Sequence, residues 1–421
     1  MNVLFVTTEP PWPPLGGASL RTYNFIRYLG PRHRLHLVCY ATARQELALR
    51  ETMGPWCQSI HGVPLPERRG PARRILDTMS ERLPDVVQRF TSPAMTETVA
   101  RLLAAENGLD LVHVVGLEAA SAVFPGDPRR GPAARPRVLL DALNVEHLLQ
   151  RQAFQVAGRS PAEWPRALYS WIQSEKLRSY EKQLCAQAAG VVAVSQEDKA
   201  ALEHLAPGRR TALVPNGVDA GLYRPPASSG PETVCVPDLP EGQSVLLFTG
   251  TMDYRPNVDA VLWFAEEVFP LVLRAFPSAH FAVVGRNPAA SVRKLSGPHI
   301  TVTGAVPDDL PYFHRASVFV LPMRFGGGSR LKLLQAMACG LPVVTTSAGA
   351  GGVDVCPQEH AVVTDTVANF AESVVQLLRD KDAARRLGQQ GRKLALKYDW
   401  EDSARQLESF YQSLLAVPSG D

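Results

Sequence analysis

Short apolar runs alternate along most of the chain with longer stretches in which apolar positions recur every three or four residues. The short runs are almost continuously apolar, which is typical of strands buried on both faces of a parallel sheet. The longer stretches have the period of helices that cover such a sheet. The expected strands are 3–7, 35–40, 111–115, 137–140, 190–194 and 211–214, then 244–250, 280–284, 300–303, 317–321, 342–345 and 361–363. The clearest helical stretches are 19–29, 93–105, 175–188, 258–269, 369–378 and 400–415.

Residues 216–243 separate the two series of strands, are rich in turn-forming residues and have no periodicity. The sequence therefore predicts an α/β protein with two doubly wound domains, 1–215 and 216–399, and a hinge at the Asn216-Gly217 turn signal. The length of 421 residues agrees with two domains. The helix at 400–415 follows the second series.

The composition of the chain indicates which partners and which cellular compartment to expect. A net charge of +3 is too small to favour nucleic acid, so no nucleic acid is expected as a partner. The six cysteines are scattered without the spacing of a metal site, which suits a reducing cytoplasm. The first residues lack the pattern of a signal peptide, and no apolar run has the length of a membrane span. We therefore expect a cytoplasmic protein.

A basic cluster contains Arg68, Arg69, Arg73 and Arg74. One interpretation is peripheral contact with an acidic membrane surface. The favoured interpretation is a solvated loop, because basic runs are common in loops and Pro71 is expected to break any helix there.

Three glycines, Gly326–Gly328, stand between the expected strand 317–321 and a helical pattern that opens at Ser329. A helix that starts directly after a glycine loop presents free backbone N–H groups to an anion. Arg330 and Lys332 add positive charge in the first turn, where the helix dipole disfavours cations unless an anion is bound. The alternative for both side chains is an exposed position on the helix. The predicted phosphate site consists of Gly327, Gly328, Ser329, Arg330 and Lys332.

A second glycine loop follows the first expected strand and contains Gly16 and Gly17, with Ser19 as the expected N-cap of the next helix. The spacing is not that of the dinucleotide fingerprint. The loop is either a second phosphate contact or a tight strand-to-helix turn. Open α/β sheets bind ligands beyond the carboxyl ends of their strands. A cleft between two such domains suits a ligand with phosphate at its centre, such as a nucleotide sugar.

The motifs resemble those of the GT-B glycosyltransferases of family 4, with a C-terminal glycosyl transferases group 1 domain, in the manner of bacterial polysaccharide sugar transferases. The most specific segments are Val214-Pro-Asn-Gly-Val-Asp219 and Ala336-Met-Ala-Cys-Gly-Leu-Pro342. The other matching segments follow the chain in order at 16–17, 141–147, 194–198, 248–257, 284–285, 304–308 and 326–335.

The resemblance implies two Rossmann-like domains facing a cleft and a retaining transfer of sugar from a nucleotide sugar. The donor would lie mostly on domain 216–399, and a carbohydrate, lipid-linked or small-molecule acceptor mostly on domain 1–215. Neither a metal nor another cofactor is implied. The helix 400–415 would return to pack on the N-terminal domain.

The sequence departs from the family at its pair of glutamates, whose positions are taken by Gly327 and Gln335. The amide oxygen of Gln335 is still able to accept a hydrogen bond from a ribose hydroxyl, without charge. The basic pair that clamps the diphosphate in the family is also missing, with Met252 and Asn257 near its places. Arg330 and Lys332 are expected to supply that charge instead.

Three candidate catalytic residues, Asn144, Glu146 and His147, follow the strand 137–140. Side chains at this position of an α/β sheet commonly contact ligands. His147 either orients a sugar hydroxyl and shares a proton, or only begins a helix. Glu146 is equally an acid favoured by the helix dipole. Asp141 is expected to be a turn acceptor.

Two other functions stay open at this stage. The GT-B architecture also includes nucleotide-sugar 2-epimerases, which use acids to move protons. The missing glutamates also allow a non-catalytic homologue that binds nucleotide or glycan.

Overall fold

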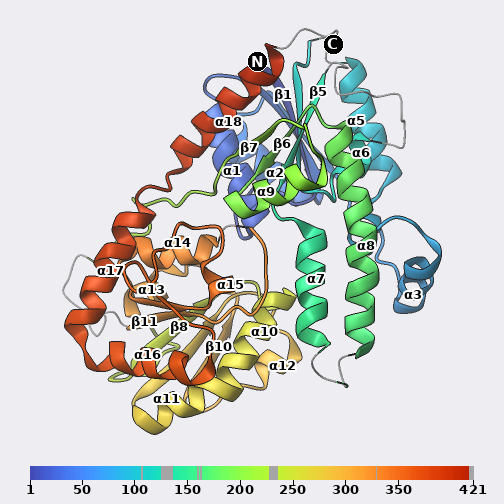
Figure 1. Cartoon of the computed structure of the whole chain (residues 1–421). Coiled ribbons are helices and arrows are strands. Elements are labelled where there is room, and N and C mark those ends of the chain that lie inside the picture. The colour runs from blue at the N-terminus through green and yellow to red at the C-terminus, as the bar shows by residue number, and fades with distance from the viewer. Residues whose placement is uncertain are drawn as a thin grey trace. The chain divides into compact units, whose positions relative to one another are not determined.

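The computed structural model describes residues 1–105, 108–124, 136–158, 161, 164–226, 236–328 and 330–416. They form two compact units (Figure 1), the first made of Met1–Asn216 with the chain from Trp400 onward and the second of Gly217–Asp399. Each unit is a parallel sheet with helices packed on it. The expected α/β class with two Rossmann-like sheets is confirmed.

The sheet of the first unit has the strand order β3-β2-β1-β4-β5-β6-β7, and all neighbouring strands are parallel. Six of these strands follow from the apolar runs. The exception is β3, which carries His61 and Gly62 among its apolar residues and so has no continuous run. The strands are β1 Asn2–Thr7, β2 Arg34–Tyr40, β3 Ser59–Val63, β4 Leu111–Val115, β5 Arg137–Ala142, β6 Gly190–Ala193 and β7 Thr211–Leu213.

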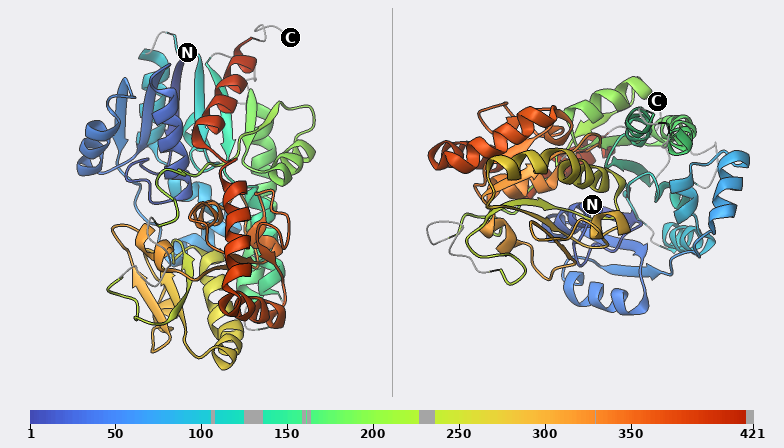
Figure 2. Two further views of the ribbon diagram at one scale, coloured as in Figure 1. Left: turned by 90° about the vertical axis from the view of Figure 1, so that its left-hand side faces the viewer. Right: turned by 90° about the horizontal axis from the view of Figure 1, so that it is seen from below.

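Helices of the first unit lie around this sheet (Figure 2). Consecutive helices α7 and α8 lie side by side, and α18 packs on α1 although more than 370 residues of chain separate them (Figure 1). The helices are α1 Gly17–Leu29, α2 Ala43–Met53, α3 Pro71–Ser80, α4 Asp85–Phe90, α5 Pro93–Ala105, α6 Ala120–Val123, α7 Glu146–Ala157, α8 Trp164–Gln187, α9 Gln196–Leu205 and α18 Trp400–Leu415.

The sheet of the second unit has the order β10-β9-β8-β11-β12-β13, again with parallel neighbours. Its strands are β8 Ser244–Thr249, β9 Ala279–Val284, β10 Ile300–Gly304, β11 Val318–Leu321, β12 Val343–Thr345 and β13 Val362–Val363. Its helices are α10 Arg255–Trp263, the π-helical turn η3 Phe264–Val268, α11 Phe269–Ala275, α12 Ala290–Arg293, α13 Leu310–Arg315, α14 Leu331–Ala338, α15 Ser347–Ala350, α16 Val367–Arg379 and α17 Lys381–Ala395.

The strand orders reverse direction once in each sheet, between β1 and β4 in the first unit and between β8 and β11 in the second. At such a point the loops after the two strands diverge to opposite faces and leave room for a ligand at the carboxyl ends. The predicted glycine loops follow β1 and β11, and the predicted catalytic residues follow β5. The topology therefore brings the candidate residues of each unit to the ligand-binding edge of its own sheet.

Only half of the basic cluster around Pro71 is a loop, because Arg68 and Arg69 precede α3 whereas Arg73 and Arg74 lie in its first turn. Pro71 is the first residue of α3. Proline is tolerated there because the first N–H of a helix has no partner within the helix and the fixed φ of proline is already helical. The expectation that Pro71 prevents a helix was therefore wrong.

A buried polar network holds α18 on the first unit. The guanidinium of Arg21 on α1 donates two hydrogen bonds to Asp141, at 2.8 and 3.0 Å, and a third to Asn216 at 2.9 Å. The ring of His113 lies 3.2 Å from Asp141 on one side and hydrogen-bonds Tyr411 of α18 on the other. Arg21, His113, Asp141 and Tyr411 are fully buried. Asp141 is thus the charged centre of the core and lies in β5, which corrects the expectation that it is a turn acceptor.

Candidate functional site

At the reversal point of the second sheet, the side chain of Lys332 lies close to the backbone that follows β8. Nζ of Lys332, in the first turn of α14, lies 2.7 Å from Oδ1 of Asn257 and 4.5 Å from the ring centre of Phe248. Asn257 in turn donates to the carbonyl of Thr251, at 2.9 Å. Lys332 of α14 therefore reaches Asn257 at the start of α10, which is itself bonded to the loop after β8.

Glycine is required where these strands end. A Cβ on Gly250, whose φ is +154°, would stand 2.7 Å from Nζ of Lys332. A Cβ on Gly285 would meet the carbonyl oxygen of Gly250 at 1.7 Å. The missing side chains leave bare backbone next to the amine of Lys332, which is the arrangement that allows close approach of a ligand.

The amine of Lys332 is poised between its charged and neutral forms. Burial, together with the positive charge of Arg330, lowers the pKa of Lys332 to about 7. A bound anion would raise this pKa again, because it favours the charged form. Lys332 is thus a side chain that gains positive charge when an anion arrives.

Arg330 hydrogen-bonds the glycine loop through its guanidinium. Its guanidinium donates to the carbonyl of Gly327 at 2.5 Å and to that of Ala348 at 3.1 Å, and the residue is buried. The helix α14 begins at Leu331 and not at Ser329, so Arg330 is its N-cap residue and not part of its first turn, and the alternative of an exposed helix position is wrong for it. A phosphate contact of Arg330 stays a prediction. Gly328 has a φ of +67°, which favours glycine. Ser329 lies outside the described residues.

Gln335 lies on α14, one turn after Lys332, and is half-buried. Its predicted contact with a ribose stays a prediction.

The glycine loop of the first unit is a helix cap. Gly16 is the N-cap of α1, which begins at Gly17, so Ser19 is inside the helix and not its cap. The N–H of Gly16 donates to the hydroxyl of Ser19 at 2.8 Å, and that hydroxyl donates back to the carbonyl of Gly16 at 2.9 Å. These bonds close the first turn of α1, and residues 8–16 connect it to β1, so the connection is longer than a tight strand-to-helix turn. A phosphate contact of Gly16 and Gly17 stays a prediction.

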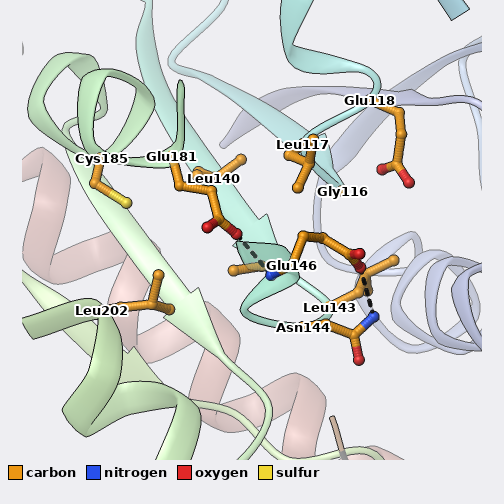
Figure 3. Close-up of a pocket in the computed structure, with 11 residues that line it drawn as sticks. Gly116, Leu117, Glu118, Leu140, Leu143, Asn144, Glu146, Glu181, Cys185 and Leu202 are labelled. Atoms are coloured by element: carbon orange, nitrogen blue, oxygen red, sulfur yellow. Dashed lines mark hydrogen bonds between the residues drawn. The ribbon is translucent and has the colours of Figure 1, made fainter. Parts of the chain in front are cut away.

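Three glutamates surround a cavity of about 60 Å³ beyond the ends of β4 and β5 (Figure 3). Glu118 follows β4, Glu146 begins α7, and Glu181 comes from α8. Nδ2 of Asn144 donates to Oε1 of Glu146 at 2.9 Å. Burial and the charges of Glu118 and Glu181 raise the pKa of Glu146 to about 8. The raised pKa favours the protonated form of Glu146, which is able to donate a hydrogen bond.

The side chain of His147 is held by a hydrogen bond to Glu181. Oε1 of Glu181 accepts the N–H of Glu146 at 2.7 Å, and Oε2 accepts from Nδ1 of His147 at 2.6 Å. The two bonds fix the start of α7 and the tautomer of the imidazole, because Nδ1 must carry the proton that Glu181 accepts. Asn144 and Glu146 line the cavity, whereas His147 is not among its lining residues.

Sequence reasoning missed Glu118, Glu181 and the contact between Asn257 and Lys332. The position of Glu118 just after β4 is a signal of the same kind that identified Glu146. Glu181 lies in the middle of a long helix, and its sequence neighbours give no indication of its role. Among the residues that the structure describes, no group of three or more His, Cys, Asp or Glu side chains has the geometry of a metal site.

Replacing Glu146 by glutamine is expected to remove a pH-dependent loss of stability. An unfolded glutamate ionises at ~4.3, whereas this one ionises at about 8 in the folded state. The folded state therefore holds an additional proton between these values, and the free energy of unfolding falls as pH rises from about 5 to about 8. Thermal denaturation across this range should show a flatter profile, and a higher Tm at pH 8, for Glu146→Gln.

The matched control is Glu203→Gln on the exposed side of α9. This variant should keep the pH profile of the wild type. Parallel profiles for Glu146→Gln and the wild type would contradict the assignment of a raised pKa.

Two family models match the chain. The model for Glycosyltransferase Family 4 matches residues 15–222, and the model for Glycosyl transferases group 1 matches residues 243–380. The first match corresponds to the unit with the glutamate cavity, and the second to the unit with Lys332.

Curated relatives are similar at low identity. A GDP-mannose-dependent alpha-(1-6)-phosphatidylinositol monomannoside mannosyltransferase of Mycobacterium tuberculosis is 28% identical over 221 residues, which are 48% of this chain and 56% of the relative. A D-inositol 3-phosphate glycosyltransferase of Segniliparus rotundus is 27% identical over 250 residues, 56% of this chain and 54% of the relative. The chain thus spans about half the length of these relatives.

Solved structures match almost the whole chain. A sucrose-phosphate synthase of Thermosynechococcus elongatus aligns with a TM-score of 0.71 at 19% identity, covering 99% of this chain and 100% of that one. Anabaena Alr3699/HepE in complex with UDP aligns with a TM-score of 0.65 at 15% identity, covering 98% and 100%. At these identities the likeness concerns the fold. Together with the two matched family models, it places the chain among the family-4 glycosyltransferases with the GT-B fold.

Proposed function

We propose that the protein transfers a sugar from a nucleotide diphosphate sugar to a hydroxyl acceptor with retention of anomeric configuration. The observation that carries the proposal is the amine of Lys332, placed 2.7 Å from Asn257 beside side-chain-free backbone at Gly250. This arrangement lies at the reversal point of the second sheet, where α/β proteins bind nucleotides. In this proposal Lys332 takes the place of the basic pair that clamps the diphosphate in the family and is missing after β8.

The proposed reaction breaks the bond between the anomeric carbon and the diphosphate oxygen. The sugar then becomes oxocarbenium-like, and negative charge grows on the leaving phosphate. Lys332, which takes up a proton from solvent when the donor binds, balances this charge, and amides of the glycine loop held by Arg330 donate to the same phosphate. The acceptor oxygen forms the new bond on the face that the phosphate leaves, and its proton passes to a phosphate oxygen. No protein base is needed for this step.

The first unit supplies the acceptor contacts in this proposal. The protonated carboxyl of Glu146 donates a hydrogen bond to an acceptor hydroxyl, and the amide of Asn144 holds that carboxyl in place, at 2.9 Å. Two curated relatives are named for inositol-based acceptors, which are rich in hydroxyls. A carbohydrate, a lipid-linked sugar or a small polyol is therefore the proposed acceptor class. The activity requires neither a metal nor another cofactor.

The proposal is tested by calorimetric titration with UDP, GDP, ADP and TDP at pH 6.5 and pH 8.5. At least one nucleotide should bind. Because the pKa of Lys332 is about 7 in the free protein and higher beside a phosphate, binding above pH 7 requires proton uptake. Affinity should therefore fall by up to about tenfold for each pH unit above 7.

The variant Lys332→Arg controls for ionisation of the nucleotide itself, because arginine stays charged throughout this range. It should bind with a weaker pH dependence than the wild type. Failure of all four nucleotides to bind would overturn the proposed function, and equal pH dependence in both proteins would overturn the role of Lys332.

A further inference from the structure

Helix α3 presents its apolar side chains to solvent. Ile75, Leu76 and Met79 are 65%, 58% and 80% exposed, and Ala72 is exposed on the same face. These positions have the spacing i, i+3, i+4 and i+7, so they form one stripe along the helix. Helices of globular proteins normally turn such a stripe inward, and an outward one marks an interaction surface.

The opposite face of α3 is polar and buried, which explains the outward stripe. Asp77 accepts from Arg69 at 2.8 Å and from Arg73 at 2.9 Å, and is itself buried. Lys176 of α8 donates to the carbonyl of Thr78 at 2.6 Å. Figure 1 shows α3 beside α8 in the first unit. Ion pairs and hydrogen bonds therefore fix the helix in this orientation.

The surroundings of the stripe are basic. The segment 65–89 contains six arginines and four acids. Two of the acids, Asp77 and Asp85, are buried and already paired with arginines. The exposed charges are five arginines, at 68, 73, 74, 82 and 89, and two glutamates, at 67 and 81. The arginines at 73, 74 and 89 also pair with Asp77 or Asp85, so six arginines against four acids leave the segment a net charge of +2. A surface with this rim is complementary to a negatively charged partner.

We infer that the stripe of α3 and its arginine rim dock the protein on an anionic lipid membrane. A stripe of three large side chains on a ten-residue helix falls far short of the ~800 Å² per partner of a stable protein interface. A lipid surface accepts a small apolar stripe in its interfacial layer and attracts the surrounding arginines, each worth about 1 kcal/mol near an anionic leaflet. The attachment is peripheral, and no helix among the described residues is both long enough and apolar enough to cross a bilayer.

The inference is tested by co-sedimentation of the full chain with vesicles of phosphatidylcholine alone and with one third phosphatidylglycerol. The wild type should bind only the vesicles with phosphatidylglycerol, and binding should weaken at least tenfold between 50 mM and 500 mM salt. The variant Ile75→Glu/Met79→Glu should lose at least tenfold in affinity. Both positions are exposed, so the variant should keep the circular dichroism spectrum and Tm of the wild type.

Leu47→Glu is the control, because Leu47 is an exposed apolar residue on α2. It should bind vesicles like the wild type. Equal binding by the α3 variant, or a wild type that binds no vesicles, would overturn the inference. Binding that persists in the α3 variant but is lost in Trp164→Ser/Trp171→Ser would place the surface on α8 and also overturn it. A wild-type dimer that becomes a monomer in the α3 variant would identify the stripe as a contact between copies of the chain.

Discussion

Replacing Lys332 by methionine should reduce kcat/KM for sugar transfer by about 10²–10³-fold, the usual cost of losing one donor to a developing negative charge. Methionine keeps most of the apolar stem over Phe248 but removes the amine that contacts Asn257. The proposed role of the amine, which is charged once the donor is bound, is to balance the negative charge that grows as the diphosphate leaves. The loss should therefore appear both in the KM for the donor and in kcat, the latter measured by release of nucleoside diphosphate with saturating donor.

The matched control is Lys294→Met, which removes an exposed lysine at the end of α12 in the same unit. Its kinetics should equal those of the wild type. Glycosyl transfer at the wild-type rate by Lys332→Met would exclude the amine from the reaction. A rise in KM with unchanged kcat would show that Lys332 binds the donor without stabilising the transition state.

The variant Asp141→Asn should lower the free energy of unfolding of the first unit by about 3–5 kcal/mol, because it leaves the charge of Arg21 buried without its counter-ion. Burial by itself would raise the pKa of Asp141, but the charge of Arg21 and the hydrogen bonds from His113 and Arg21 outweigh it and lower the pKa to about 2. The stabilisation is therefore present above about pH 4 and is lost as pH falls toward 2. Urea denaturation at pH 7 measures the difference.

The control is Asp382→Asn, which removes an exposed partner of Arg385 on α17. A surface pair of this kind contributes about 0–1 kcal/mol. Combining Arg21→Met with Asp141→Asn should recover part of the loss, because the double variant no longer buries an unpaired charge. A loss in Asp141→Asn no larger than in Asp382→Asn would contradict the network.

The network has a consequence for the end of the chain. Tyr411 of α18 hydrogen-bonds His113 next to Asp141, and the ring of Trp400 packs edge-on against Phe25 of α1, with centres 6.1 Å apart. The ring of Trp400 and the hydroxyl of Tyr411 thus both attach α18 to the first unit. This explains why a helix that follows the second sheet in sequence belongs to the first unit.

The sequence by itself determined most of the strands and their order, although β3 and α3 were missed. Apolar runs such as 3–7 and 280–284 have no polar face, so they are stable only as strands covered on both sides. Two series of such runs determined two parallel sheets. The glycine loop after β11 and the polar residues Asn144, Glu146 and His147 after β5 were also visible, because strand ends and helix starts are local features.

Only the tertiary structure decided which distant side chains meet. Lys332 and Asn257 are 75 residues apart and Glu181 and His147 are 34 residues apart, and no local pattern relates them. Tertiary structure also decided which face of α3 is exposed, because the spacing of its apolar residues is the same whether that face points to the core or to solvent. The buried ion pairs of Asp77 and Asp85 select the outward orientation. Periodicity is a property of neighbouring residues, whereas burial, pairing and a shifted pKa depend on what the folded chain brings from elsewhere.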